Sequence, residues 1–215
     1  MSRIGRVVHD RGVQRRMGAA ALSGVLLALA FPAFDVGALA IVALVPLLWT
    51  WRDASPARTA LYGFTFGVVF AAALMYWLWY FGIVAIVPLV AGWAAYTALS
   101  GYLVGCLNRA GLGSRFGSPW LIAAAWVVPE ALRGRWPFGG LPWGDVGVAL
   151  HDFPPARALA SWGGVALVSF LLVVLNAYLL ELAIALRANA RGAIVFASAK
   201  CCSVRNPLRF SSVVR

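Results

Sequence analysis

Long apolar segments alternate with short polar segments along most of this chain. The apolar segments cover residues 17–34, 36–51, 61–81, 83–107, 120–132 and 162–186, and a further one begins at Gly192. About 20 helical residues, each rising about 1.5 Å, cross a hydrocarbon core of roughly 30 Å. Membrane barrels would instead show short strands of alternating polarity. The pattern therefore predicts an all-α fold, a polytopic transmembrane helical bundle of about six spans plus a truncated seventh.

The composition agrees with a membrane protein. Of the 215 residues, 62% are hydrophobic and 12% are charged, whereas soluble domains are about half apolar and a quarter charged. The formal net charge is +11, but the basic residues lie in small groups between the apolar segments. One continuous basic patch would be expected on a nucleic-acid surface. The membrane is therefore a predicted partner and nucleic acid is not.

The arginines also predict the orientation of the chain. If the N-terminus is cytoplasmic, the cytoplasmic segments carry eleven Arg and the opposite loops carry three. Excess arginine marks the cytoplasmic side, so we expect a multi-pass protein of the bacterial cytoplasmic (inner) membrane with its N-terminus inside. The first apolar segment resembles a cleaved signal peptide, but Pro32 and the immediate second segment favour a retained helix.

Three regions follow from this map. Residues 1–16 form a cytoplasmic Arg-rich N-terminus, and residues 17–190 form a transmembrane domain with an outer loop at 133–160. Residues 191–215 form a truncated seventh span and an atypical tail.

The outer loop and its flanks differ from the rest of the chain. Residues 126–164 combine five Pro, four Trp and several charged residues, and long loops of this kind are often functional. Glu130 and Arg133 share one helix face, so two interpretations remain open: a lipid-headgroup or substrate contact, or a structural ion pair at the helix end. His151 is predicted to be a surface residue without a catalytic role.

No complete catalytic, cofactor or metal motif is present. The sequence has no nucleophile elbow, zinc-protease motif or phosphate-binding loop, so no catalytic residue, metal site or cofactor is predicted. Cys106 lies in an apolar segment and is expected to be a small buried packing residue. Cys201 and Cys202 follow the single Lys, Lys200, in the tail. The apolar segments hold no charged or polar pair, which argues against a solute transporter.

Four short motifs, in order, carry a family resemblance. They are Phe31-Pro32, the stretch 39–48, the stretch 63–67 leading to Tyr76-Trp77-Leu78, and the stretch 130–134 followed by Leu141-Pro142-Trp143. Over about residues 20–190 the sequence resembles the membrane domain of bacterial apolipoprotein N-acyltransferases.

The resemblance implies a reaction and two substrates. The enzymes of this family transfer an acyl chain from a phospholipid to the N-terminal amine of a diacylglyceryl-cysteine lipoprotein, through a thioester on a Cys, with a Glu as base and a Lys stabilising the oxyanion. Those three residues belong to a nitrilase-like domain, and none of them maps onto this sequence. What the resemblance implies here is an outer lipid- or substrate-binding mouth formed by Glu130, Arg133, Pro142 and Trp143.

We therefore expect this chain to be the membrane half of such an enzyme and to be inactive alone. Its C-terminal residues bear no resemblance to the catalytic domain, which suggests a truncated or frameshifted gene product. Two alternatives remain open: half of a split enzyme with a separate catalytic chain, and a non-catalytic membrane scaffold or lipid-binding module.

Overall fold

The protein is described by a computed structural model that covers residues 11–112, 118–137 and 139–204, with side chains to residue 189. Within these residues all regular structure is helical and no strand occurs, so the predicted all-α fold is confirmed. The chain divides into two compact units, Met1–Leu179 and Leu180–Arg215. The first unit holds every contact discussed below.

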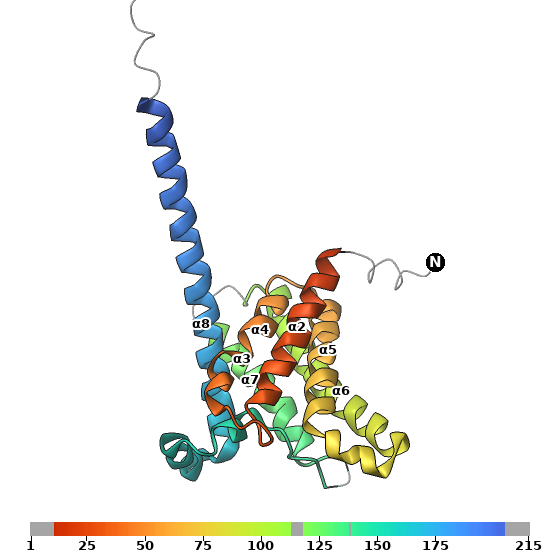
Figure 1. Ribbon diagram of the computed structural model, residues 1–215. Helices are drawn as coiled ribbons and strands as arrows, with labels where there is room; N and C mark the ends of the chain where they lie inside the picture. Colours follow the sequence, from red (N-terminus) through yellow and green to blue (C-terminus); the bar gives the residue numbers. More distant parts are fainter. Residues whose placement is uncertain (1–10, 113–117, 138, 205–215) are drawn as a thin grey trace, which may run out of the picture. The chain divides into compact units, whose positions relative to one another are not determined.

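Figure 1 shows the order of the helices along the chain. They are α2 (Arg11–Leu29), η1 (Gly37–Leu39), α3 (Ala40–Ala43), α4 (Val45–Trp51), α5 (Pro56–Leu74), η2 (Tyr76–Phe81), α6 (Ile83–Arg109), α7 (Ser118–Arg133), η3 (Val146–Leu150) and α8 (Pro154–Val204). Among the described residues, three helices are long and apolar enough to cross a membrane: Pro56–Leu74, Ile83–Arg109 and Pro154–Asn189. The protein is therefore a membrane-spanning helical bundle, whereas the count of six spans stays a prediction.

The second apolar segment is not one continuous helix. It is divided into η1, α3 and α4, and α4 has Pro46 in its first turn. Proline has no N–H and cannot extend the preceding helix, so α3 ends before it. The third apolar segment is also divided, because α5 ends at Leu74 and the aromatic residues that follow form η2.

Asn176 of α8 bridges the break between α3 and α4. Its Oδ1 accepts a hydrogen bond of 3.0 Å from the Leu44 N–H, and its Nδ2 donates one of 3.0 Å to the Ala40 carbonyl. Asn176 is fully buried. A single polar side chain in an apolar segment thus supplies the backbone partners that the interrupted helix lacks.

Helices α5 and α6 approach each other through glycines. A Cβ added to Gly63 would lie 2.3 Å from the Thr97 carbonyl oxygen, and one added to Gly101 would lie 2.3 Å from the Thr59 carbonyl oxygen. Gly67 and Gly105 continue the two rows with equally close approaches. This spacing of small residues is typical of closely packed membrane helices.

Two sequence predictions about individual positions differ from the structure. Cys106, expected to be buried, is partly exposed, because it lines an open cavity near the end of α6. A break was predicted between residues 186 and 192, but α8 continues through both and is non-helical only at Gly163 and Gly164. The intervening Arg and Ala residues favour helix, so a polar stretch alone does not end it.

Candidate functional site

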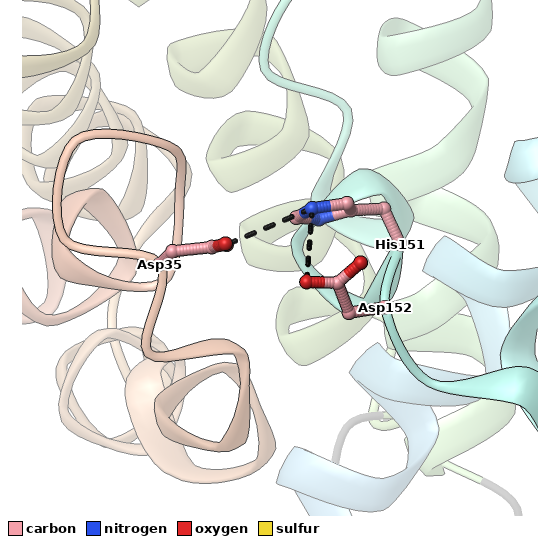
Figure 2. A group of neighbouring side chains, drawn as sticks. All are labelled: Asp35, His151 and Asp152. Carbon is pink, nitrogen blue, oxygen red and sulfur yellow. Dashed lines mark ion pairs between the residues drawn. The ribbon is translucent and has the colours of Figure 1, made fainter.

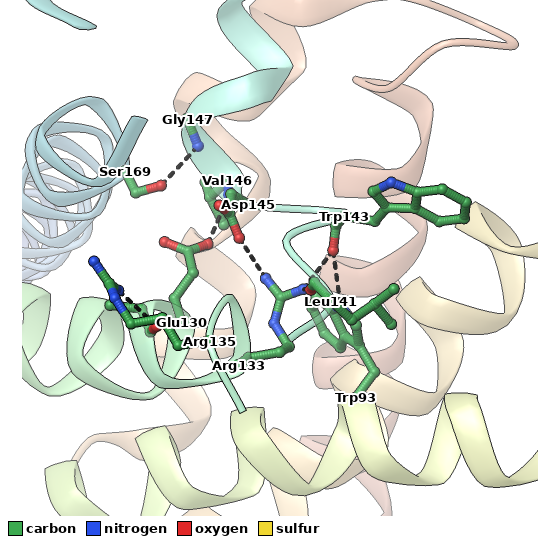
Figure 3. A network of polar contacts seen from close by, with 11 residues as sticks. Trp93, Glu130, Arg133, Arg135, Leu141, Trp143, Asp145, Val146, Gly147 and Ser169 are labelled. Atoms are coloured by element: carbon green, nitrogen blue, oxygen red, sulfur yellow. Dashed lines mark hydrogen bonds and ion pairs between the residues drawn. The ribbon is translucent and has the colours of Figure 1, made fainter. Parts of the chain in front are cut away.

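Arg133, the last residue of α7, organises the loop that leads to η3. Its Nη1 donates to the carbonyl oxygens of Leu141, at 2.7 Å, and Trp143. Its Nη2 donates to Asp145 Oδ1 at 2.6 Å and forms a salt bridge with that carboxylate (Figure 3). Arg133 is buried. The guanidinium therefore fixes the backbone of this loop at two carbonyls and one side chain.

Trp93 of α6 holds the same loop from the other side. Its indole Nε1 donates a hydrogen bond of 3.0 Å to the Trp143 carbonyl. The Arg133 guanidinium lies 4.7 Å from the centre of the Trp93 ring, within the range of a cation–π interaction. Two helices thus converge on the carbonyl of Trp143 (Figure 3).

Glu130 lies one turn before Arg133 and contacts the start of η3. Its Oε1 accepts a hydrogen bond of 2.8 Å from the Val146 N–H. The next N–H, of Gly147, donates to Ser169 Oγ of α8 at 2.9 Å. Glu130 is itself buried, and its carboxylate satisfies a backbone donor that the apolar surroundings would otherwise leave unpaired.

The ion pair predicted between Glu130 and Arg133 does not form. Among the described residues Arg133 pairs with Asp145, and Glu130 bonds to the backbone of Val146. The loop after α7 supplies a partner to each side chain: the Val146 N–H to Glu130, and two carbonyls and the Asp145 carboxylate to Arg133. The two residues thus contact different parts of the loop, and whether they also contact a lipid or substrate stays a prediction.

Asp145 carries the negative charge that balances Arg133. Burial raises the pKa of the Asp145 carboxyl above its ordinary value, and the adjacent Arg133 guanidinium opposes that rise. Removing one partner of a buried pair leaves the other charge unpaired at a cost of about 3–5 kcal/mol. The pair therefore acts as a structural unit.

A groove of about 390 Å³ opens beside this network. We call it the loop groove, and its lining comes from the first half of α6 and from the loop: Pro88, Leu89, Gly92, Trp93, Tyr96, Arg133, Trp136, Pro137, Gly140 and Leu141. The Tyr96 hydroxyl donates to the Trp136 carbonyl at 2.6 Å, joining its two walls. Its volume lies within the roughly 300–1,000 Å³ range of ligand pockets. A mainly apolar groove with one guanidinium suits an apolar chain that carries an anionic group.

The four residues predicted at the outer mouth fall into two pairs. Glu130 and Arg133 are buried and hold the loop, whereas Pro142 and Trp143 are exposed. The Trp143 ring contacts the Trp77 ring of η2, with 5.1 Å between their centres. Only Pro142 and Trp143 therefore present substantial surface to a ligand.

Sequence reasoning missed the roles of three residues in this network. Trp93 and Ser169 lie in apolar segments, where nothing marks one aromatic or hydroxyl residue among the others. Asp145 is one of the several charged residues of segment 126–164, and the sequence did not identify its partner. The loop lacks a regular period, so its sequence does not show which of its charges pairs with Arg133.

Comparison with known proteins identifies the family to which this chain belongs. Residues 23–178 match the family model described as the apolipoprotein N-acyltransferase N-terminal domain. The chain belongs to the apolipoprotein N-acyltransferase family. The resemblance seen in the sequence is therefore confirmed, and the match includes the whole Arg133 network and the loop groove.

Individual members of the family show how far the likeness extends. The apolipoprotein N-acyltransferase of Methylococcus capsulatus is 38% identical over 167 residues, which cover 74% of this chain and 33% of that protein. Those of Geobacter metallireducens and Pseudomonas putida are 30% and 35% identical, covering 76% of this chain and 32% and 34% of their own lengths. The chain thus spans about a third of the length of these relatives, in the part that forms their membrane domain.

Proposed function

We propose that this chain is the membrane part of an apolipoprotein N-acyltransferase and that its loop groove holds lipid acyl chains during lipoprotein maturation. The observation that carries the proposal is the apolar groove with the Arg133 guanidinium in its wall. The substrates would be a phospholipid acyl donor and a diacylated lipoprotein. Both contain long apolar chains, which match the mainly apolar lining of the groove.

The charge of Arg133 in the groove lining supports binding of a lipid with an anionic headgroup. A guanidinium has five N–H donors, and three hydrogen bonds of Arg133 go to Leu141, Trp143 and Asp145. Arg133 is itself only 3% exposed but lines the groove, so we expect its positive charge, and not an open donor, to favour a phosphate nearby. Exposed Pro142 and Trp143 lie next to this wall, and Trp is favoured where membranes meet water.

The proposal includes an orientation in the bacterial inner membrane. With a cytoplasmic N-terminus and six spans, eleven Arg lie in cytoplasmic segments and three lie in outer loops. The loop groove then faces the outside, where lipoproteins mature. Three helices of spanning length support membrane insertion, and the arginine distribution supports the direction.

A photoreactive phospholipid tests the groove directly. We expect phosphatidylethanolamine with a diazirine in its acyl chain to label peptides from α6 and from residues 134–141 of the purified protein. Gly92→Leu should remove most of this labelling, because Gly92 lines the groove and a Cβ there has nothing within 4 Å. Gly18→Leu is the matched control, since Gly18 also has open space around it. Equal labelling of both variants would contradict lipid binding in the groove.

A second pair of variants tests the exposed tryptophan. Trp143→Ala should weaken labelling of the loop, whereas Trp162→Ala should leave it unchanged. Both side chains are exposed, at 49% and 90%, but only Trp143 lies beside the groove. Comparable labelling in the two variants would remove Trp143 from the proposed binding surface.

We also propose that these 215 residues alone do not transfer acyl chains. No residue of the thioester chemistry expected of the family maps onto the chain, and the matched part of its relatives is their membrane domain. Expression in a strain depleted of its own enzyme should therefore yield no triacylated lipoprotein, and its formation would contradict the proposal. Adding a catalytic domain as a separate chain distinguishes the alternatives: restored activity indicates half of a split enzyme, and none indicates a non-catalytic module.

A further inference from the structure

A second cluster of polar side chains lies apart from the Arg133 network. Asp35, in the connection between α2 and η1, and His151 and Asp152, between η3 and α8, bring their side chains together (Figure 2). His151 Nε2 lies 3.7 Å from Asp35 Oδ1 and 3.5 Å from Asp152 Oδ2. One nitrogen and two carboxylate oxygens therefore face a common point.

We propose that Asp35, His151 and Asp152 form a binding site for a divalent cation of the zinc class, a property beyond the proposed acyl-transfer role. Zinc binds imidazole nitrogen and carboxylate oxygen at about 2.0–2.2 Å in tetrahedral geometry. Ligand atoms at those bond lengths lie roughly 3.3 Å apart. The two distances to His151 are close to this value, and all three ligand atoms lie within 4.8 Å of one another.

The chemistry of the three ligands selects the class of metal. An imidazole nitrogen suits zinc and neighbouring transition metals, whereas calcium and magnesium prefer oxygen ligands alone. Two carboxylates and a neutral imidazole carry a total charge that balances one divalent cation. The carboxylates are partly exposed, 45% for Asp35 and 79% for Asp152, so water can reach the site and occupy a fourth position.

The backbone brings the two ligand segments together without a metal. A Cβ added to Gly37 would lie 2.6 Å from the Ala149 carbonyl oxygen, so the segments that carry Asp35 and His151 are in direct contact. The Nδ1 of His151 is buried, which leaves Nε2 as the nitrogen directed at the carboxylates (Figure 2). A bound cation would add a link between the connection after α2 and the start of α8.

Zinc titration of the purified full chain in detergent tests this site. Calorimetry and metal analysis should show one zinc equivalent that is lost in Asp35→Asn and in His151→Gln. Removal of a ligand should lower the affinity for zinc at least as much as the roughly 10–100-fold that loss of an outer-shell partner causes. Asp53→Asn is the matched control, because Asp53 also has a left-handed backbone, with φ 55° against 57° for Asp35. Equal stoichiometry in all four proteins would overturn the proposal and leave the three side chains in direct contact with no ion between them.

A measurement on the unaltered chain avoids any effect of substitution on folding. Diethyl pyrocarbonate modifies accessible imidazoles, and the sequence contains two His, His9 and His151. Zinc should protect His151 from modification, as read by mass spectrometry of its peptide, and His9 serves as the internal reference. Equal modification of His151 with and without zinc would count against the site.

Discussion

The guanidinium of Arg133 makes its interactions within the protein. Its guanidinium contacts two carbonyls, one carboxylate and the face of Trp93. Such a position requires a planar group with several fixed donors, and a lysine ammonium offers neither the plane nor the fork. At the scale of the residue, Arg133 therefore acts first by fixing the loop that follows α7.

Replacing Arg133 by Gln should destabilise the protein strongly. The change leaves the Asp145 carboxylate partly buried without its cation, at an expected cost of about 3–5 kcal/mol in the free energy of unfolding. Denaturant titration in mixed micelles measures this quantity. Arg135→Gln is the matched control and should cost at most about 0.5 kcal/mol, because Arg135 is exposed and its side chain, among the described residues, donates to the Ala131 carbonyl alone.

A double substitution separates the lost charge balance from the lost packing. Arg133→Gln combined with Asp145→Asn removes both charges, so it should be less destabilising than the sum of the two single changes. Strict additivity of the three free energies would show that the pair does not act as a unit.

Asn176 shows how one residue stabilises an interrupted element. Asn176→Leu should leave the Leu44 N–H and the Ala40 carbonyl without their side-chain partner, at about 1–3 kcal/mol for each group. Leu175→Ala is the control on the same helix, because Leu175 is exposed, and it should change the unfolding free energy little. If the two variants unfold alike, the bridge across the break contributes no stability.

The packing of α5 against α6 depends on the absence of side chains at four glycines. Gly101→Ala would place a Cβ 2.3 Å from the Thr59 carbonyl oxygen, so the helices must separate, at a cost of about 1–3 kcal/mol. Gly18→Ala, in open space within α2, should be neutral or slightly stabilising. Thermal unfolding of the two variants in the same detergent makes the comparison.

The sequence predicts helical elements better than their ends. Apolar length alone predicted the three helices of spanning length among the described residues, because a segment in lipid must form its backbone hydrogen bonds internally. It did not locate the breaks at Leu44 and at Gly163–Gly164, which depend on Pro46, on Asn176 far along the chain, and on glycine conformation. Charges beside an apolar segment marked Glu130 and Arg133, but a loop without periodicity gave no means to identify Asp145 and Val146 as their partners.

At the scale of the whole molecule, orientation is the first property to test. Reporter fusions after residue 109 and after residue 187 should be cytoplasmic, and a fusion at residue 153 should be external, because arginine-rich segments are retained inside. Alkaline phosphatase and green fluorescent protein report the two sides in opposite ways. An external reporter at residue 109 would reverse the predicted orientation and turn the loop groove towards the cytoplasm.

The spacing of the Arg133 network has a consequence for biosynthesis. Asp145 follows Arg133 by 12 residues. Ribosomes add about 5–20 residues per second, so Asp145 is synthesised roughly one second after Arg133. The partners of Asn176 precede it by 132 and 136 residues, which corresponds to roughly ten seconds at the same rates. The loop can therefore close around α7 while the ribosome is still translating α8, and the break in the second apolar segment receives its partner last.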